Sequence, residues 1–174
     1  MDFDKFCGNY KETLNNSFGI LGKDTFFDSY KITCVKDRVA KNDTGYDILD
    51  FGCGIGKIAG LLAREFSKST VYGYDISKEC LATAKRQNSG IKNLCFIDNL
   101  SNGQKFDLIL AAGVFHHIKA KERITILSQL KEILKSGGRI IVFEHNPFNP
   151  LTRHIVNRCL FDNSNFKNGE PNAS

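Results

Sequence analysis

A glycine-rich segment, Asp50 to Gly56, has the residue types and spacing that most clearly predict ligand binding. Gly52, Gly54 and Gly56 permit a tight turn with positive φ, and they let the backbone approach a ligand without a clash from Cβ. A helical pattern follows directly, so the N–H groups at the helix start are expected to face this loop. The segment therefore predicts binding of an anionic group.

Asp50 adds a second requirement on the ligand. It stands two residues before Gly52, at the end of an expected strand, where a carboxylate can hold a cation. A ligand that presents both an anion and an ammonium group, as an amino acid does, satisfies both features. A dinucleotide is an alternative because residues 54–59 match the G-x-G-x-x-G/A pattern, and a glycine turn without a ligand is another.

Short apolar runs alternate with helical patterns through the middle of the chain. The strands are expected over residues 46–51, 69–74, 94–97, 106–110 and 139–143. One helix is expected to carry an apolar stripe of five residues and to stop at residues 136–138; the stripe consists of Ile124, Leu127, Leu130, Ile133 and Leu134. The alternation predicts an α/β fold, a Rossmann-like doubly wound parallel sheet of about five strands with flanking helices.

Polar residues that follow the expected strands should gather at one edge of this sheet, because right-handed crossovers bring all the strand ends there. Asp75 lies about 20 residues beyond the glycine loop, where an acceptor for ribose hydroxyls is expected, and a helix N-cap is the alternative. Ile76 suits one face of an adenine or a place in the core. Asp98 and Asn99 follow the third strand in a turn-rich loop, and Ala111 ends the fourth.

Three parts are expected along the chain: a helical N-terminal cap at residues 1–46, a core at 47–160 and a polar, disordered tail at 161–174. An apolar face of the cap is expected from Phe26, Phe27, Tyr30 and Val35.

Composition narrows the class of protein. No apolar run reaches the ~20 residues of a membrane span, and no signal peptide is visible, so we expect a cytoplasmic protein without a membrane span. The net charge of +5 comes from dispersed lysines and arginines, and nucleic acid is not an expected partner. The six cysteines are far apart with no C-x-x-C pair, which favours neither a disulfide framework nor a metal site.

The ordered set of motifs resembles the class I S-adenosylmethionine (SAM)-dependent methyltransferases. Residues 50–56 resemble their D-x-G-x-G-x-G cofactor loop, residues 106–118 their fourth-strand motif, and residues 134–139 their L-K-x-G-G-x segment with Ser136 in place of Pro. The resemblance covers residues 47–145 and implies SAM as the cofactor. It implies cofactor contacts from Tyr10, Asp50, Gly52, Cys53, Gly54, Gly56, Asp75, Ile76, Asp98, Asn99 and Ala111.

Histidines near two strand ends are the candidates for a catalytic base, which methyl transfer needs only if the acceptor must lose a proton. His117 is the first candidate, His145 and His116 are further ones, and structural histidines are the alternative. Residues 144–152 resemble the E-H-N-P-x-N-P-L-T segment of a subgroup that acts on small molecules, which implies a small-molecule acceptor.

The resemblance ends early, because relatives carry two further strands that we do not recognise after Asp162. The fifth strand is then expected to be an open edge, which a homodimer would cover. We predict a SAM-dependent methyltransferase acting on an unidentified small molecule. A truncated, non-catalytic SAM-binding protein with an interaction role is the alternative, and Asp50 and the later motifs disfavour an NAD-linked oxidoreductase.

Overall fold

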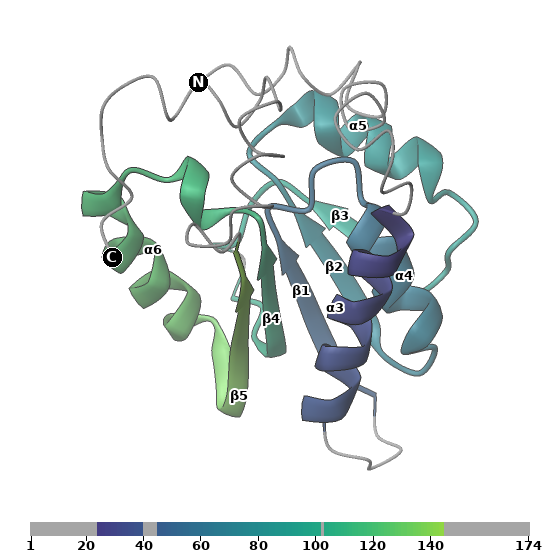
Figure 1. Cartoon of the computed structure of the whole chain (residues 1–174), viewed down its shortest axis with the longest axis horizontal. Coiled ribbons are helices and arrows are strands. Elements are labelled where there is room, and N and C mark those ends of the chain that lie inside the picture. Colours follow the sequence, from purple (N-terminus) through teal and green to yellow (C-terminus); the bar gives the residue numbers. More distant parts are fainter. Residues whose placement is uncertain (1–23, 40–44, 102, 145–174) are drawn as a thin grey trace.

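A computed structural model describes residues 24–39, 45–101 and 103–144 (Figure 1). In chain order its elements are α3 (Asp24–Arg38), β1 (Asp47–Phe51), α4 (Lys57–Glu65), β2 (Thr70–Tyr74), α5 (Lys78–Gln87), β3 (Leu94–Ile97), β4 (Phe106–Ala112), the 3-10 turn η1 (Phe115–His117), α6 (Ala120–Glu132) and β5 (Leu134–Phe143).

The five strands form one sheet in the order β3-β2-β1-β4-β5, and every neighbouring pair is parallel. Strand order runs outward from β1 in one direction through β2 and β3, and in the other through β4 and β5. This arrangement confirms the predicted doubly wound sheet. The strand order reverses between β1 and β4, and open α/β sheets bind ligands beyond the carboxyl ends of the strands at such a point.

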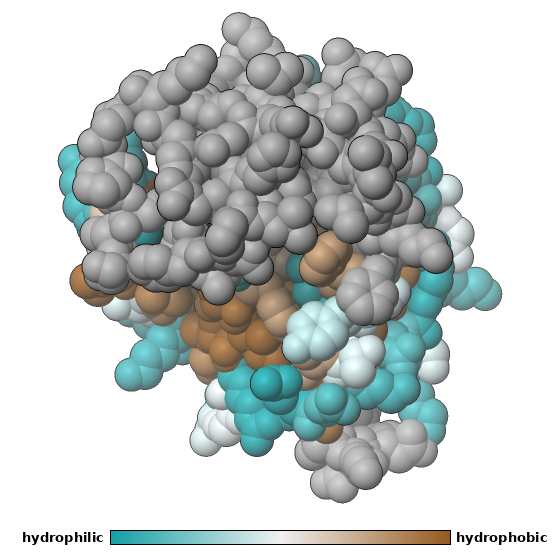
Figure 2. All heavy atoms as spheres, viewed as in Figure 1, coloured by the Kyte–Doolittle hydropathy of each residue, from teal (hydrophilic) through white to brown (hydrophobic). Residues whose placement is uncertain are grey.

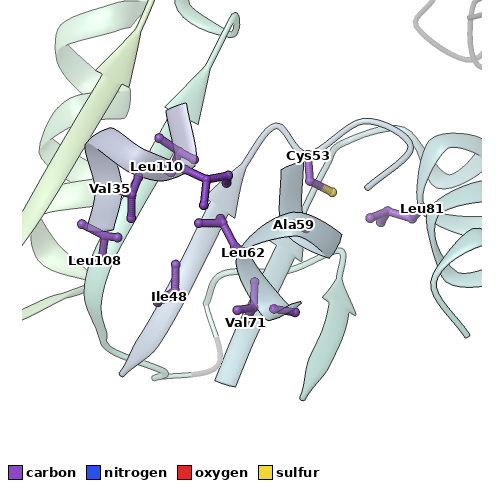
Figure 3. Packing of buried hydrophobic residues seen from close by; sticks show 11 residues of the cluster. Val35, Ile48, Cys53, Ala59, Leu62, Val71, Leu81, Leu108 and Leu110 are labelled. Carbon is purple, nitrogen blue, oxygen red and sulfur yellow. The ribbon is translucent and has the colours of Figure 1, made fainter. Parts of the chain in front are cut away.

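Helices α3, α4 and α5 cover one face of the sheet (Figures 1 and 3). Figure 3 shows Val35 of α3 and Leu62 of α4 turned toward Ile48 of β1, all three of them fully buried. The strands are apolar on this face because a parallel sheet between helices is shielded from water on both sides. The packing fixes α4, and with it the loop that precedes α4, against β1.

The second face is covered by α6, whose Leu130 packs with Phe106 and Ile109. Ile126 and Ile133 pack against the same cluster, whereas Ile124 is 76% exposed and Leu127 is also exposed. The predicted stripe is therefore confirmed at Leu130 and Ile133 and wrong at Ile124 and Leu127, and Ile126, which was not predicted, packs against the sheet. Figure 2 shows a further apolar patch over β4 and β5, the latter forming the edge of the described sheet.

The end of α6 differs from the prediction. The helix ends at Glu132, not at residues 136–138, and β5 begins at Leu134, before the two glycines. The register between β4 and β5 shifts between Phe106 and Leu108, so the glycines lie in an irregular start of the strand, where Gly137 has φ 76°. The glycine pair thus permits a strand irregularity and not a helix cap.

The cap prediction is only partly correct. Helix α3 confirms a helical segment before the sheet, but Phe27 and Tyr30 are exposed, and the buried side chains are Asp28, Ile32 and Val35. The cysteine expectation is wrong at Cys80, which is disulfide-bonded. Cys34, Cys53 and Cys95 are free thiols, and of these Cys95 is exposed.

No helix in the described ranges has the length and apolar character needed to cross a membrane. The predicted cytoplasmic location and the boundaries of the three parts stay predictions. Tyr10, His145 and the 161–174 tail lie outside the described residues.

Candidate functional site

The glycine loop joins β1 to α4 at the carboxyl edge of the sheet. Gly52, Gly54 and Gly56 have φ values of 74°, 52° and 78°, so all three occupy the left-handed region that favours glycine. The backbone N–H groups of Gly52 and Cys53 donate to the carbonyl oxygen of Tyr74 at 2.8 and 2.9 Å. The loop is therefore fastened to the end of β2 and held in its turn.

The three glycines differ in what surrounds them. A Cβ added at Gly52 would lie 2.6 Å from Val114, and one at Gly56 would lie 2.7 Å from Phe96. Among the described residues, no atom lies within 4 Å of a Cβ built at Gly54. Gly52 and Gly56 are thus required by packing within the protein, whereas Gly54 presents bare backbone to open space that a ligand can enter.

Asp50, at the end of β1, is a buried acid with an incomplete set of contacts. Its side chain is 2% exposed, and no hydrogen-bond partner of Oδ2 is found among the described residues. Burial raises the pKa of Asp50 to about 7, although the Ala59 N–H and the charge of Lys31 act in the opposite direction. An orphaned carboxylate oxygen costs free energy, so a cationic partner here would be strongly favoured.

Helix α3 contributes two charged residues near Asp50 that the sequence did not predict as part of the site. Asp28 is buried and pairs with Lys57, the first residue of α4, at 2.7 Å, and with Lys31 at 3.1 Å. The pair with Lys57 fastens α3 to the helix that starts at the glycine loop. Because Asp28 and Lys31 also act on the pKa of Asp50, α3 contributes to the electrostatics of the site.

Asp75 follows β2 and connects the glycine loop to the start of α5. Its Oδ2 accepts the Gly54 N–H at 2.8 Å, and its Oδ1 accepts the Ser77 N–H at 2.9 Å. The N-cap of α5 is Ser77, whose Oγ accepts the Cys80 N–H at 3.1 Å, so the N-cap alternative for Asp75 is wrong. Asp75 instead orders the open part of the loop, and its predicted contact with a ribose stays a prediction.

The other predicted cofactor residues lie on the same edge or in the strands beside it. Ile76 is 69% exposed beside Asp75, as an uncovered apolar side chain. Asp98 and Asn99 are exposed after β3, and the Asn99 side chain accepts the Ser101 N–H in a local turn. Ala111 is fully buried in β4. Burial raises the pKa of the Cys53 thiol, which keeps this thiol neutral within the loop.

The turn η1, which follows β4, and the end of β5 lie together at the same edge of the sheet. Both His116 and His117 lie in η1, and their rings are 3.8 Å apart between centroids. Glu144, directly after β5, lies with Oε2 2.7 Å from Nδ1 of His116. The sequence predicts that the ends of the fourth and fifth strands share one edge of the sheet, but it does not predict this contact, which joins residues 28 positions apart.

Comparison with known proteins identifies the family. A profile described as a methyltransferase domain matches residues 42–169, which is most of the chain. The chain therefore belongs to the class I SAM-dependent methyltransferases, and the predicted family is confirmed. SAM is the cofactor of this family.

Three curated relatives illustrate its range. Ribosomal RNA small subunit methyltransferase C of Hahella chejuensis is 33% identical over 135 residues, covering 71% of this chain and 39% of that protein. Malonyl-(acyl-carrier protein) O-methyltransferase 1 of Ilyobacter polytropus is 31% identical over 99 residues, which cover 55% of this chain and 36% of that protein. Ubiquinone/menaquinone biosynthesis C-methyltransferase of Desulfotalea psychrophila is 25% identical over 154 residues, with 83% and 57% covered. The chain thus spans between 36% and 57% of the length of these relatives.

Solved structures show the same fold. A TehB-like SAM-dependent methyltransferase from Corynebacterium glutamicum has a TM-score of 0.61 at 24% identity, over 78% of this chain and 71% of that one. Magnesium protoporphyrin IX methyltransferase from Synechocystis, solved with bound SAH, has a TM-score of 0.62 at 21% identity. The match covers 80% of this chain and 68% of that one. These likenesses confirm the Rossmann-like sheet.

The residues of the site fit an amino-acid-bearing cofactor such as SAM. Asp50 has a buried oxygen without a partner among the described residues, and such an oxygen suits an ammonium group. Gly54 leaves open space beside its backbone, which suits close approach of a ligand. The two features are four residues apart on one loop.

Proposed function

We propose that this protein transfers the methyl group of SAM to a small-molecule acceptor. The observation that carries the proposal is Asp50, a fully buried carboxylate whose Oδ2 finds no partner in the part of the chain that is described. A dinucleotide offers no ammonium group to this oxygen, whereas the amino-acid part of SAM does. Membership of the methyltransferase family supports the same cofactor.

Within this proposal three residues at this edge of the sheet bind the cofactor. Asp50 binds the ammonium group, and the bare backbone at Gly54 lets the cofactor lie against the loop. Asp75 accepts hydrogen bonds from the ribose hydroxyls. Each of its oxygens already accepts one backbone N–H, and a carboxylate oxygen has capacity for a second hydrogen bond.

Bound SAM supplies an electrophilic methyl group on a sulfonium, so the protein needs mainly to align an acceptor with it. The small-molecule class is supported by the segment that begins at Glu144 and by relatives named for quinone biosynthesis. A relative named for ribosomal RNA means that the charge argument against nucleic acid does not decide the acceptor. The homodimer over the edge of β5 stays a prediction.

Two measurements test the proposal. Calorimetric titrations with SAM and with NAD should show binding of SAM alone, and a preference for NAD would contradict the cofactor. SAM with a labelled methyl group is then incubated with the protein, a panel of small molecules and ribosomal RNA. Label in a small molecule supports the proposal, and label in RNA alone contradicts the acceptor class. SAM binding without any transfer would favour the non-catalytic alternative.

A further inference from the structure

Glu144 makes three hydrogen bonds that join the end of β5 to the turn after β4. Its Oε1 accepts the Val114 N–H at 3.0 Å and the Phe115 N–H at 2.7 Å, and its Oε2 contacts Nδ1 of His116 at 2.7 Å. One carboxylate therefore holds both the backbone of η1 and an imidazole ring. The ring orientation is fixed by an acid from another strand and not by its own turn alone.

This cluster lies directly beside the glycine loop. The Val114 side chain occupies the space where a Cβ at Gly52 would lie, so the turn that Glu144 holds packs on the turn that begins the cofactor site. Gly113, with φ 69°, donates its N–H to the Phe143 carbonyl at 2.8 Å and brings its backbone near the His116 ring. The carboxyl ends of β4 and β5 thus meet at His116, and the loop after β1 packs beside them on Val114.

The contact has the chemistry of a supported base. A carboxylate at Nδ1 favours the tautomer that carries its proton there, which makes Nε2 the basic nitrogen, and it stabilises the imidazolium once Nε2 gains a proton. Although burial opposes ionisation of Glu144, its hydrogen bond and charge interaction with His116 and its two backbone N–H contacts hold the pKa of Glu144 below its ordinary value. Glu144, directly after β5, and His117 of η1 both contact the His116 ring.

We propose that His116, oriented by Glu144, is the general base of this protein, and that its acceptor carries a protonated nucleophile, an O–H or N–H group. The inference rests on the proposed methyl transfer and deepens it. It assigns the proton to His116, where sequence analysis favours the neighbouring His117. His116 is the proposed catalytic residue, and Glu144 is its positioning residue.

The step balances without a further reactant. The acceptor's oxygen or nitrogen forms a bond to the methyl carbon, the carbon–sulfur bond breaks, and its electron pair stays on sulfur. The acceptor proton passes to Nε2 of His116, and the positive charge that leaves the sulfonium is thereby balanced by imidazolium beside the Glu144 carboxylate. An acceptor that is already an anion would not need this group.

The test compares two kinds of probe with the whole protein and labelled SAM. One set consists of phenols, alcohols and aromatic amines, which carry neutral O–H or N–H nucleophiles at neutral pH, and the other consists of iodide and thiocyanate, which carry no proton. With the first set, the rate should rise with pH through the histidine range. His116→Gln should lower that rate by ~10²–10⁴ while SAM affinity changes by less than about threefold.

Glu144→Gln separates positioning from mere structure. It should lower the rate about tenfold, and it should move the midpoint of the pH profile to lower pH, because the neutral amide no longer stabilises imidazolium. Glu132→Gln removes an exposed carboxylate at the end of α6 and is the matched control, with an unchanged midpoint expected. A loss of rate in Glu144→Gln with an unmoved midpoint would show a purely structural role and overturn the proposal.

The remaining outcomes are also decisive. A loss confined to His117→Gln would show that the sequence-based candidate is the base, and our inference would be wrong. Methylation of only the anionic probes, or an unchanged rate in folded His116→Gln, would likewise overturn it while the proposed function stands. Normal SAM binding with no transfer to any probe would instead remove the proposed function, and the inference with it.

Discussion

Two acids of β1, three residues apart, differ completely in their surroundings. Asp47, at the amino end of the strand, pairs with Lys135 at 2.7 Å, and the same Nζ lies 2.8 Å from Asp107. The Asp107 carboxylate also accepts the Asp47 N–H at 2.7 Å. Asp50, at the carboxyl end, is more deeply buried, yet its Oδ2 has no hydrogen-bond partner among the described residues.

Asp47 and Asp107 thus form ion pairs that join neighbouring strands, whereas Asp50 has an oxygen without a partner among the described residues. Lys135 links the amino ends of β1, β4 and β5, and its two carboxylate contacts, opposed by burial, raise its pKa. This is a self-contained ionic cluster. At the opposite edge one oxygen of the buried Asp50 carboxyl group has no partner among the described residues, which is unfavourable for folding, and the ammonium group of the proposed cofactor would supply that partner.

The largest effect is expected at the open glycine. Gly54→Val places a branched side chain at φ 52° and into the space beside the loop, so SAM affinity should fall by more than about 100-fold, or over ~2.7 kcal/mol. Gly103→Val is the matched control, because Gly103 also has positive φ and open space but lies in the loop before β4. Equal affinity in both variants by calorimetry would refute the role of the loop.

Asp50→Asn should weaken SAM binding by about 30–100-fold, because it removes a charge-assisted contact of ~2–3 kcal/mol with the ammonium group. The amide keeps the shape of the side chain, so thermal unfolding should confirm a folded protein before affinity is measured. An unchanged dissociation constant in the folded variant would assign Asp50 a structural role and remove the comparison between the two ends of β1.

The raised pKa of Asp50, about 7, predicts a pH dependence of binding. Below pH 7 the free protein carries a protonated Asp50, and the ammonium group must displace that proton. SAM affinity should therefore fall by about tenfold per pH unit below 7, reaching ~100-fold at pH 5, where an α-amino group remains charged. Titrations in buffers of different ionisation enthalpy should show proton release at pH 6. Asp50→Asn should abolish both effects, and a flat wild-type profile would contradict the prediction.

The smallest effect on binding is expected at the amino end. Lys135→Met breaks two half-exposed ion pairs and should lower the free energy of unfolding by about 1 kcal/mol. The Lys135 charge stabilises the fold fully at pH 7, because its raised pKa places the loss of charge above about pH 10. SAM affinity should not change. Stability is measured by denaturant titration and SAM affinity by calorimetry. A weaker SAM affinity with unchanged stability would contradict a structural role for the ion pairs at the amino end of β1.

The sequence by itself determined the family, the order of the strands along the chain and the glycine loop. These depend on local signals: apolar runs of strand length and glycines at positions that require positive φ. Such signals lie within a few residues of one another, so spacing alone is enough to predict them. The fourth and fifth strands were also predicted, although the glycines of β5 were interpreted as a helix end.

Only the tertiary structure decided which of the polar groups are satisfied. The Asp47 and Asp50 carboxylates belong to the same short strand, but Lys135, 88 residues from Asp47, pairs with Asp47. Asp50 is buried, and its Oδ2 has no partner among the described residues. Likewise Glu144 contacts His116 and not only its own strand because β4 and β5 are neighbours in the sheet. Hydrogen bonds and desolvation depend on distances across the fold, and these are set by packing and not by sequence spacing.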